Sequence, residues 1–333
     1  MKQTNNAIKF LMAQYRAIFN NAYFKGLATA AVVTVGLAAG QAQAAADANL
    51  TADELSAITG TDIIITGGSE TGDNNKWGAL QISGGKTADI QQNLTISGGA
   101  VASNYITSDD KQASTVTGKD LTINVDSKNK ATHGLTIKAG TSSGATAVFN
   151  KADVKVGVLA INAADSAAAG ALSAKTINVG TAAVAGNQGK AATEPNATIN
   201  LGKSATLGIA FDSDKSVDDF STINLNADGK ISALSGDGVT NTINAAVLNI
   251  KGGSLEVQAK SDGSSGATTT LNLASGSMDG GSIVVNKSAA LTVGFDDNDI
   301  KLQAGGEEKL TKQFNLNSGE LVAKGNITQG RRI

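Results

Sequence analysis

The sequence has no cysteine and a single proline, Pro195, and aromatic residues make up only 4% of its 333 residues. Without cysteine, the chain has no disulfide bond, no thiolate metal site and no cysteine nucleophile. A compact globular core of this size normally contains more large rings, so the core has to be built from Ile, Leu, Val and Ala. Stability must therefore come from backbone hydrogen bonds and aliphatic burial.

Basic residues are few and unevenly placed. No arginine occurs between Arg16 and Arg331, and the formal net charge is −2. Residues 1–44 contain four basic residues and no acidic one, so the remainder of the chain is more acidic than the whole. A weakly acidic chain is poorly suited to binding phosphate backbones, and we expect no nucleic-acid partner.

Motifs for catalysis are missing. His133 is the only histidine and stands outside any recognisable triad, and no Gly-x-Ser-x-Gly elbow occurs. Gly85-Lys86-Thr87 and Gly202-Lys203-Ser204 have the ending of a phosphate-binding loop, but the glycine required five positions earlier is replaced by Leu80 and Ala197. We expect no catalytic residue, no cofactor and no enzymatic activity.

Two acidic turns follow apolar segments, one from Asp212 to Asp219 and one from Asp296 to Asp299. Their carboxylates have the chemistry of Ca²⁺ ligands, but neither turn fits an EF-hand loop. We interpret both as solvated turns and predict no metal site. A polysaccharide-active β-helix enzyme is the catalytic alternative, and it would use Asp212, Asp214 and Asp218.

The amino terminus has the order of features found in a signal peptide. Lys25 precedes an apolar run, residues 26–40, which is shorter than the roughly 20 residues that span a membrane. Ala42 and Ala44 then form the small-residue pattern of a cleavage site. We predict a signal peptide with an extended basic region over 1–44, with its helix removed by cleavage after Ala44.

A short helix is expected between the signal peptide and the main body. Thr51 and Glu54 have the spacing of a capping box, Leu55 and Ile58 follow on one face, and Gly60 would end the helix. We interpret residues 45–61 as a linker and N-terminal cap that covers the end of a stacked sheet.

Residues 62–333 alternate between short apolar segments and turns. Leu94-Thr-Ile96, Leu121-Thr-Ile123 and Ile199-Asn-Leu201 place aliphatic residues on one face and polar residues on the other. Gly, Asn, Asp and Ser separate these segments, and such residues tolerate the left-handed backbone of turns. The pattern predicts an all-β domain of short strands.

A degenerate repeat indicates how the strands are arranged. The triplet Thr-Ile-Asn begins at Thr176, Thr198, Thr222 and Thr242, and Thr270-Leu-Asn272 continues the series at intervals of 20 to 28 residues. This period predicts one coil of a right-handed parallel β-helix, in which outward Asn and Thr residues form ladders with their counterparts in adjacent coils. An array of β-sandwiches is the alternative.

The signal peptide, the degenerate coils rich in Gly, Asn and Thr, and the scarcity of Cys, Arg and His together resemble the passenger region of a type V autotransporter or a related surface adhesin of Gram-negative bacteria. This resemblance implies export by the inner-membrane machinery, delivery through an outer-membrane β-barrel and display at the cell surface or release outside the cell. It also implies a role in adhesion or surface structure, with a host surface, a glycan or a second copy as partner.

One feature departs from that family. Residues up to Ile333 continue the solenoid pattern, where an autotransporter ends in a barrel with aromatic girdles. We therefore expect the solenoid to be truncated at its C-terminal end, with a periplasmic or matrix structural protein as the alternative if no barrel follows.

Overall fold

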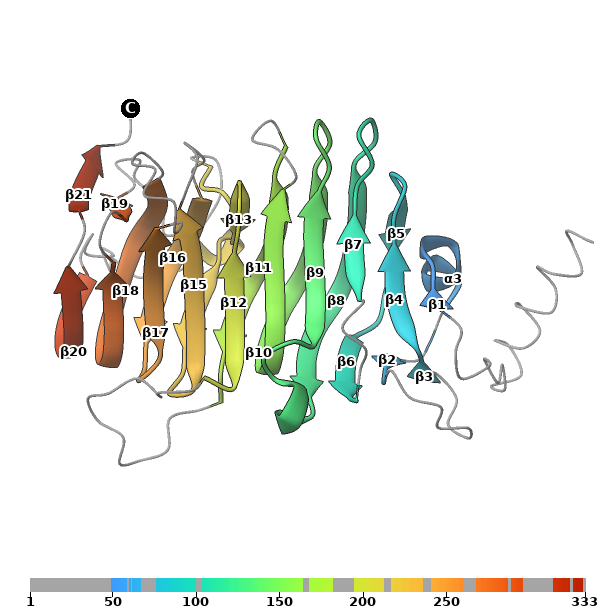
Figure 1. Ribbon diagram of the computed structural model, residues 1–333, viewed down its shortest axis with the longest axis horizontal. Helices are drawn as coiled ribbons and strands as arrows, with labels where there is room; N and C mark the ends of the chain where they lie inside the picture. Colours follow the sequence, from blue (N-terminus) through green and yellow to red (C-terminus); the bar gives the residue numbers. More distant parts are fainter. Residues whose placement is uncertain are drawn as a thin grey trace, which may run out of the picture.

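The computed structural model describes residues 49–58, 60, 62–66, 76–99, 104–163, 168–181, 195–212, 217–235, 241–259, 268–286, 289–295, 314–323 and 326–331. Within them the chain forms a β-solenoid, in which strands from successive coils lie side by side along the long axis (Figure 1). Every described strand pairing is parallel, which confirms the predicted parallel β-helix and excludes the β-sandwich alternative for these residues. The predicted signal helix over 1–44 lies outside the described residues.

The solenoid has three faces, each a ladder of parallel strands. The first face contains β1 (Asn49–Leu50), β4 (Ala79–Ile82), β7 (Tyr105–Thr107), β9 (Gly134–Ala139), the last part of β10 (Ala145–Ala163), β12 (Ala197–Leu201), β15 (Gly229–Ser235), β17 (Ser254–Ala259), and the last parts of β18 (Thr268–Val285) and β20 (Phe314–Ala323).

The second face contains β5 (Thr87–Asp89), β13 (Ala205–Leu207), β19 (Ala290–Phe295), β21 (Asn326–Arg331), and the first parts of β8 (Ser114–Val125), β10, β11 (Gly170–Val179), β16 (Asn241–Ile250) and β18. The third face contains β2 (Ile63–Ile65), β3 (Lys76–Trp77), β6 (Leu94–Gly98), β14 (Thr222–Leu225), and the remaining parts of β8, β10, β11, β16, β18 and β20.

The aliphatic residues of the alternating segments point inward and form columns. On the third face Leu94 stacks on Leu121, and the column continues through the equivalent residues of the next coils, Ala152, Ile177, Ile223 and Leu248. All of these side chains are fully buried and belong to one continuous core that runs along the solenoid. A coil cannot bury its apolar face alone, so each coil depends on its neighbours.

The helix expected after Thr51 is confirmed as α3 (Ala52–Ala57). The backbone N–H of Thr51 donates to the carboxylate of Glu54 at 2.9 Å, the half of a capping box that the spacing predicts. Leu55 is completely buried, and α3 packs against β5, the first strand of the second face. The helix ends before Gly60, whose φ is +82°. Two further helical turns among the described residues are η1 (Ser127–Asn129) and η2 (Val217–Asp219).

Successive Thr-Ile-Asn triplets do not all stack on one another in one face, as their spacing predicts. Thr222 stacks on Thr176 in the third face, whereas Thr270 stacks on Thr242 in the second face. Thr198 belongs to β12 in the first face. The predicted interval of 20 to 28 residues is the length of one coil from Thr242 to Thr270 and from Leu94 to Leu121. The coil from Thr176 to Thr222 is longer, and the intervals on either side of Thr198 run between faces.

Candidate functional site

The residues singled out in the sequence do not converge on one site in the described structure. Ala42, Ala44, Asp214 and Asp296 lie outside the described residues. Asp212 is exposed beyond β13, and Asp219 in η2 forms an ion pair with Lys175 at 3.5 Å. No group of three or more His, Cys, Asp and Glu side chains in the described segments is placed to hold a metal ion. The Nδ1 atom of His133 lies 2.8 Å from the hydroxyl of Thr132.

A different cluster of polar side chains begins on β10. Strand alternation places Lys151, Asp153 and Lys155 on the outer side of the third face. The ammonium of Lys151 donates to the carboxylate of Asp153 at 2.7 Å, and this hydrogen bond raises the pKa of Lys151. Lys155 is exposed and has no hydrogen bond or ion pair with a described residue. The register between β10 and β8 shifts between Val154 and Val156, so Lys155 is the extra residue, as in a β-bulge.

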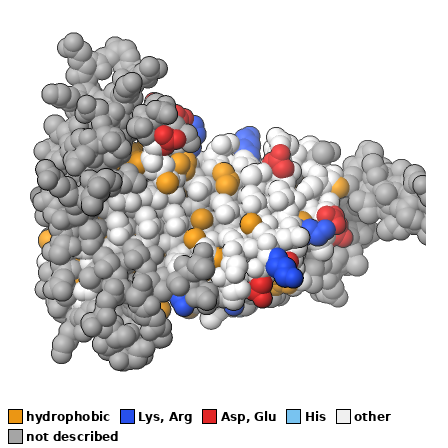
Figure 2. Space-filling view, turned by 90° about the horizontal axis from the view of Figure 1, so that it is seen from above, with side chains coloured by type: hydrophobic (Ala, Val, Ile, Leu, Met, Phe, Trp, Pro, Cys, Tyr) orange, Lys and Arg blue, Asp and Glu red, His pale blue; other side chains and the backbone are white. Residues whose placement is uncertain are grey.

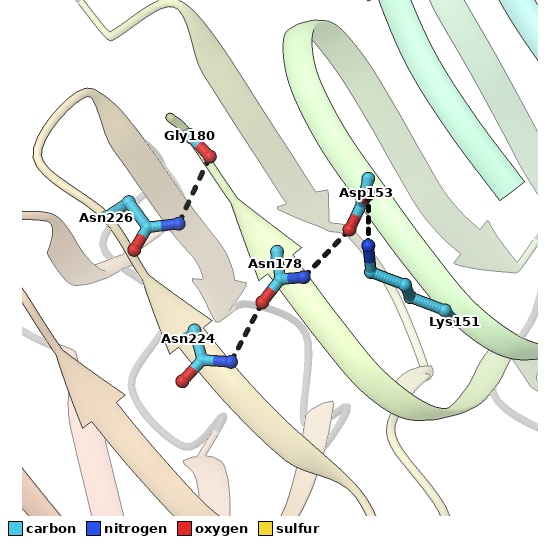
Figure 3. A network of polar contacts seen from close by, with 6 residues as sticks. All are labelled: Lys151, Asp153, Asn178, Gly180, Asn224 and Asn226. Carbon is cyan, nitrogen blue, oxygen red and sulfur yellow. Dashed lines mark hydrogen bonds and ion pairs between the residues drawn. The ribbon is translucent and has the colours of Figure 1, made fainter. Parts of the chain in front are cut away.

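The carboxylate of Asp153 begins a ladder of side-chain hydrogen bonds that continues through asparagine amides in the following coils (Figure 3). The side-chain amide of Asn178 donates to Asp153 at 2.8 Å, that of Asn224 donates to Asn178 at 2.8 Å, and that of Asn249 donates to Asn224 at 2.9 Å. These residues occupy the same outward position on successive strands. The predicted ladder of outward Asn residues is therefore confirmed on this face.

The cluster borders a groove with a volume of about 390 Å³. Its lining residues come from three successive coils and are Asp153 and Lys155 from β10, Asn178, Gly180 and Thr181 from β11 and its end, and Asn226 after β14. Gly180 has φ +84°, and a Cβ atom there would lie 2.5 Å from the backbone nitrogen of Gly229. A side chain at position 180 would therefore push adjacent coils apart beside the groove.

One rim of the groove is held by Asp228. Its carboxylate accepts the backbone N–H of Thr181 at 2.6 Å and the hydroxyl of the same residue at 3.1 Å. It also accepts the side-chain amide of Asn196 at 2.9 Å, and Lys130 donates to the amide oxygen of Asn196 at 3.1 Å. The rim is thereby tied to distant segments of the chain, which keeps Thr181 in place.

The groove is suited to binding polar ligands by hydrogen bonds. Both oxygens of Asp153 already accept hydrogen bonds, whereas the Lys155 ammonium is available to a ligand. The amide of Asn226, a partly exposed residue, donates to the carbonyl of Gly180 at 3.2 Å and has a second N–H. Figure 2 shows one face of the solenoid, on which the described surface is mostly uncharged and acidic and basic side chains are few.

Sequence reasoning missed this groove, although it anticipated the ladder beside it. The alternation of Lys151, Asp153 and Lys155 was the available signal, because three charged residues at every second position share one face of a strand. The contributions of Gly180 and Asn226 could not be recognised, because they depend on the register between coils.

Comparison with known proteins does not assign the chain to a family: no family model, no curated protein and no solved structure gives a significant match. Among the described residues no helix is long and apolar enough to cross a membrane.

Proposed function

We propose that the protein is an exported, non-catalytic surface rod, similar to an autotransporter passenger, that acts in adhesion or in the structure of the cell surface. The parallel β-solenoid carries this proposal, because it presents long flat faces made of ladders of side chains. On the third face these are amides from successive coils, an arrangement that favours binding over a large area rather than chemistry at one point.

The N-terminal pattern supports the location. The apolar run over 26–40 and the small residues Ala42 and Ala44 would direct the chain to the inner-membrane export machinery, with cleavage after Ala44. An outer-membrane β-barrel is the partner proposed for delivery to the surface. The partner at the surface is then a host surface, a glycan or a second copy of the protein.

Expression of the chain in a Gram-negative host, fused at its C-terminal end to an outer-membrane β-barrel of the autotransporter type, tests the location. We expect N-terminal sequencing of the exported protein to begin at residue 45, and extracellular protease to digest it on intact cells. Ala44→Trp should block cleavage because the processing site requires a small residue, whereas Gln43→Asn should leave cleavage unchanged. An uncleaved chain that stays in the cytoplasm would show that the export proposal is wrong.

The adhesive role is tested on the same cells. Cells that carry the protein should adhere or aggregate more strongly than cells that carry the empty vector, and removal of the surface protein by protease should abolish the difference. If cells display the protein but their adherence and aggregation do not change, the adhesive role is ruled out and the structural role remains.

A further inference from the structure

We infer that the groove lined by Asp153, Lys155, Asn178, Gly180, Thr181 and Asn226 is a binding site for a carboxylate-bearing saccharide, such as a chain of uronic acid units. This inference rests on the proposed function and names the chemical class of one partner of the rod. Four observations carry it: the charge of the groove, its free hydrogen-bonding groups, its length along the rod and the position of Lys155.

The two described carboxylates at the groove, those of Asp153 and Asp228, already have partners within the protein. Asp153 is neutralised by Lys151 at 2.7 Å. Asp228 at the rim is connected through Asn196 to Lys130. Lys155 has no acidic partner among the described residues. An anionic group on a ligand would pair with the ammonium of Lys155. A charge-assisted hydrogen bond of this kind is stronger than one between neutral groups.

The other lining groups match hydroxyls rather than a second strong charge. Asn178 and Asn226 each use one amide N–H within the protein, at 2.8 and 3.2 Å, and an amide has two. The Thr181 hydroxyl is oriented by Asp228. Sugar hydroxyls both donate and accept hydrogen bonds, so they can satisfy amide and hydroxyl groups at the same time. The described lining residues include no aromatic ring, so recognition by them depends on polar contacts.

The geometry of the solenoid matches an extended polymer. The groove crosses three coils, and parallel strands lie about 4.8 Å apart. This distance is close to the length of one sugar ring in a linear chain, so successive rings can face successive coils. The register between β10 and β8 shifts at Lys155, and bulges of this kind are frequent next to sites where a side chain is directed to a ligand.

Binding of defined oligosaccharides to the purified full chain, measured by calorimetry, tests the inference. The probe is a short linear oligomer of galacturonate, and the matched probe is the galactose oligomer of the same length, which lacks only the carboxylates. We expect the galacturonate oligomer to bind and the neutral oligomer to bind at least about tenfold more weakly, the loss typical of one charge-assisted hydrogen bond. Binding should also weaken as salt is added.

Lys155→Gln should weaken binding of the galacturonate oligomer about tenfold, because it removes the unpaired charge from the groove. Lys138→Gln on β9 is the matched control, since Lys138 is also exposed on a strand but lies on the first face, away from the groove. Both variants should unfold at the same denaturant concentration as the unchanged protein.

Equal binding of both oligomers, absence of binding, or an equal effect of the two lysine substitutions would overturn the inference. These outcomes are separate from those that test the proposed function. A chain that is exported and promotes adherence but does not bind the oligomer refutes the saccharide site alone. A chain that binds the oligomer but remains in the cytoplasm refutes the surface role alone.

Discussion

Asn104 is a polar residue within an aliphatic column of the first face. The register places it between Leu80 and Leu135, and its side chain is 1% exposed. The amide oxygen accepts the backbone N–H of Leu80 at 2.9 Å, and the amide nitrogen donates to the carbonyl of Gly134 at 3.0 Å. One buried side chain therefore satisfies backbone groups of the coils before and after its own, which a hydrophobic residue at this position could not do.

Asn104→Ala should lower the free energy of unfolding by about 2–4 kcal/mol, because it leaves a buried donor and a buried acceptor without partners. Denaturant unfolding of the purified chain measures the change. Asn249→Ala is the matched control, since this amide donates to Asn224 on the solvent side of the third face and should cost about 1 kcal/mol or less. Equal losses for the two variants would contradict the role assigned to Asn104.

Glu256 provides a second residue-scale prediction, which concerns pH. Burial raises the pKa of Glu256, but the hydrogen bonds from Lys230, Asn286 and Gln258 lower it by more than burial raises it. The pKa of Glu256 therefore lies below its ordinary value. A carboxylate with a lowered pKa stabilises the fold above the pKa of a free glutamate, about 4.3, and this contribution is lost as the pH falls through the lower value.

Glu256→Gln should therefore reduce stability at neutral pH by up to about 1 kcal/mol, the range for a partly exposed ion pair, and the difference from the unchanged protein should shrink as the pH falls below about 4. Unfolding curves recorded at several pH values check this. Lys230→Gln removes the main partner and should remove the same pH dependence. A stability difference that does not vary with pH would rule out the carboxylate as its source.

At the scale of single elements, α3 has the role of an end cap. It lies at the N-terminal end of the solenoid (Figure 1), against β5, where the second face begins. Leu55 is completely buried, and Ala52 is 3% exposed. Since an uncovered first strand would present core residues and unpaired backbone groups to water, the helix protects both.

Leu55→Ala should lower the free energy of unfolding by about 2–4 kcal/mol, the usual cost of removing a buried leucine side chain. Ser56→Ala, on the exposed side of the same helix, should change it by less than about 0.5 kcal/mol. Thermal unfolding compares the two variants. If Leu55→Ala were as stable as Ser56→Ala, α3 would not contribute to the solenoid as a cap.

The elements differ in how far sequence could predict them. Alternation of the kind seen in Leu121-Thr-Ile123 identifies a strand with one buried face, and the spacing of Thr51 and Glu54 identifies a helix start, because both depend on neighbouring residues alone. The pairing of Thr176 with Thr222 depends on the length of the intervening coil, which varies. Consequently the fold class was predictable, but the coil register and the groove built on that register were not.

At the scale of the whole molecule, the solenoid should tolerate the loss of an entire coil but not a change of register. Lys151 on β10 pairs with Thr176 on β11, so removal of residues 152–176 joins Lys151 to Ile177 and leaves Ile177 in the inward column formerly occupied by Ala152. Because each coil contacts only its neighbours, the shortened chain retains equivalent contacts on both sides of the deletion.

The chain without residues 152–176 should therefore unfold in a cooperative transition at a lower denaturant concentration than the full chain. Removal of residues 152–175 is the matched control. It leaves Thr176 in the inward position and turns Ile177 outward, since a shift of one residue exchanges the two sides of a strand. We expect this second deletion to lose the transition in circular dichroism. If both deletions folded equally well, inward columns would not determine the register, and the stacking of coils could not be what stabilises this protein.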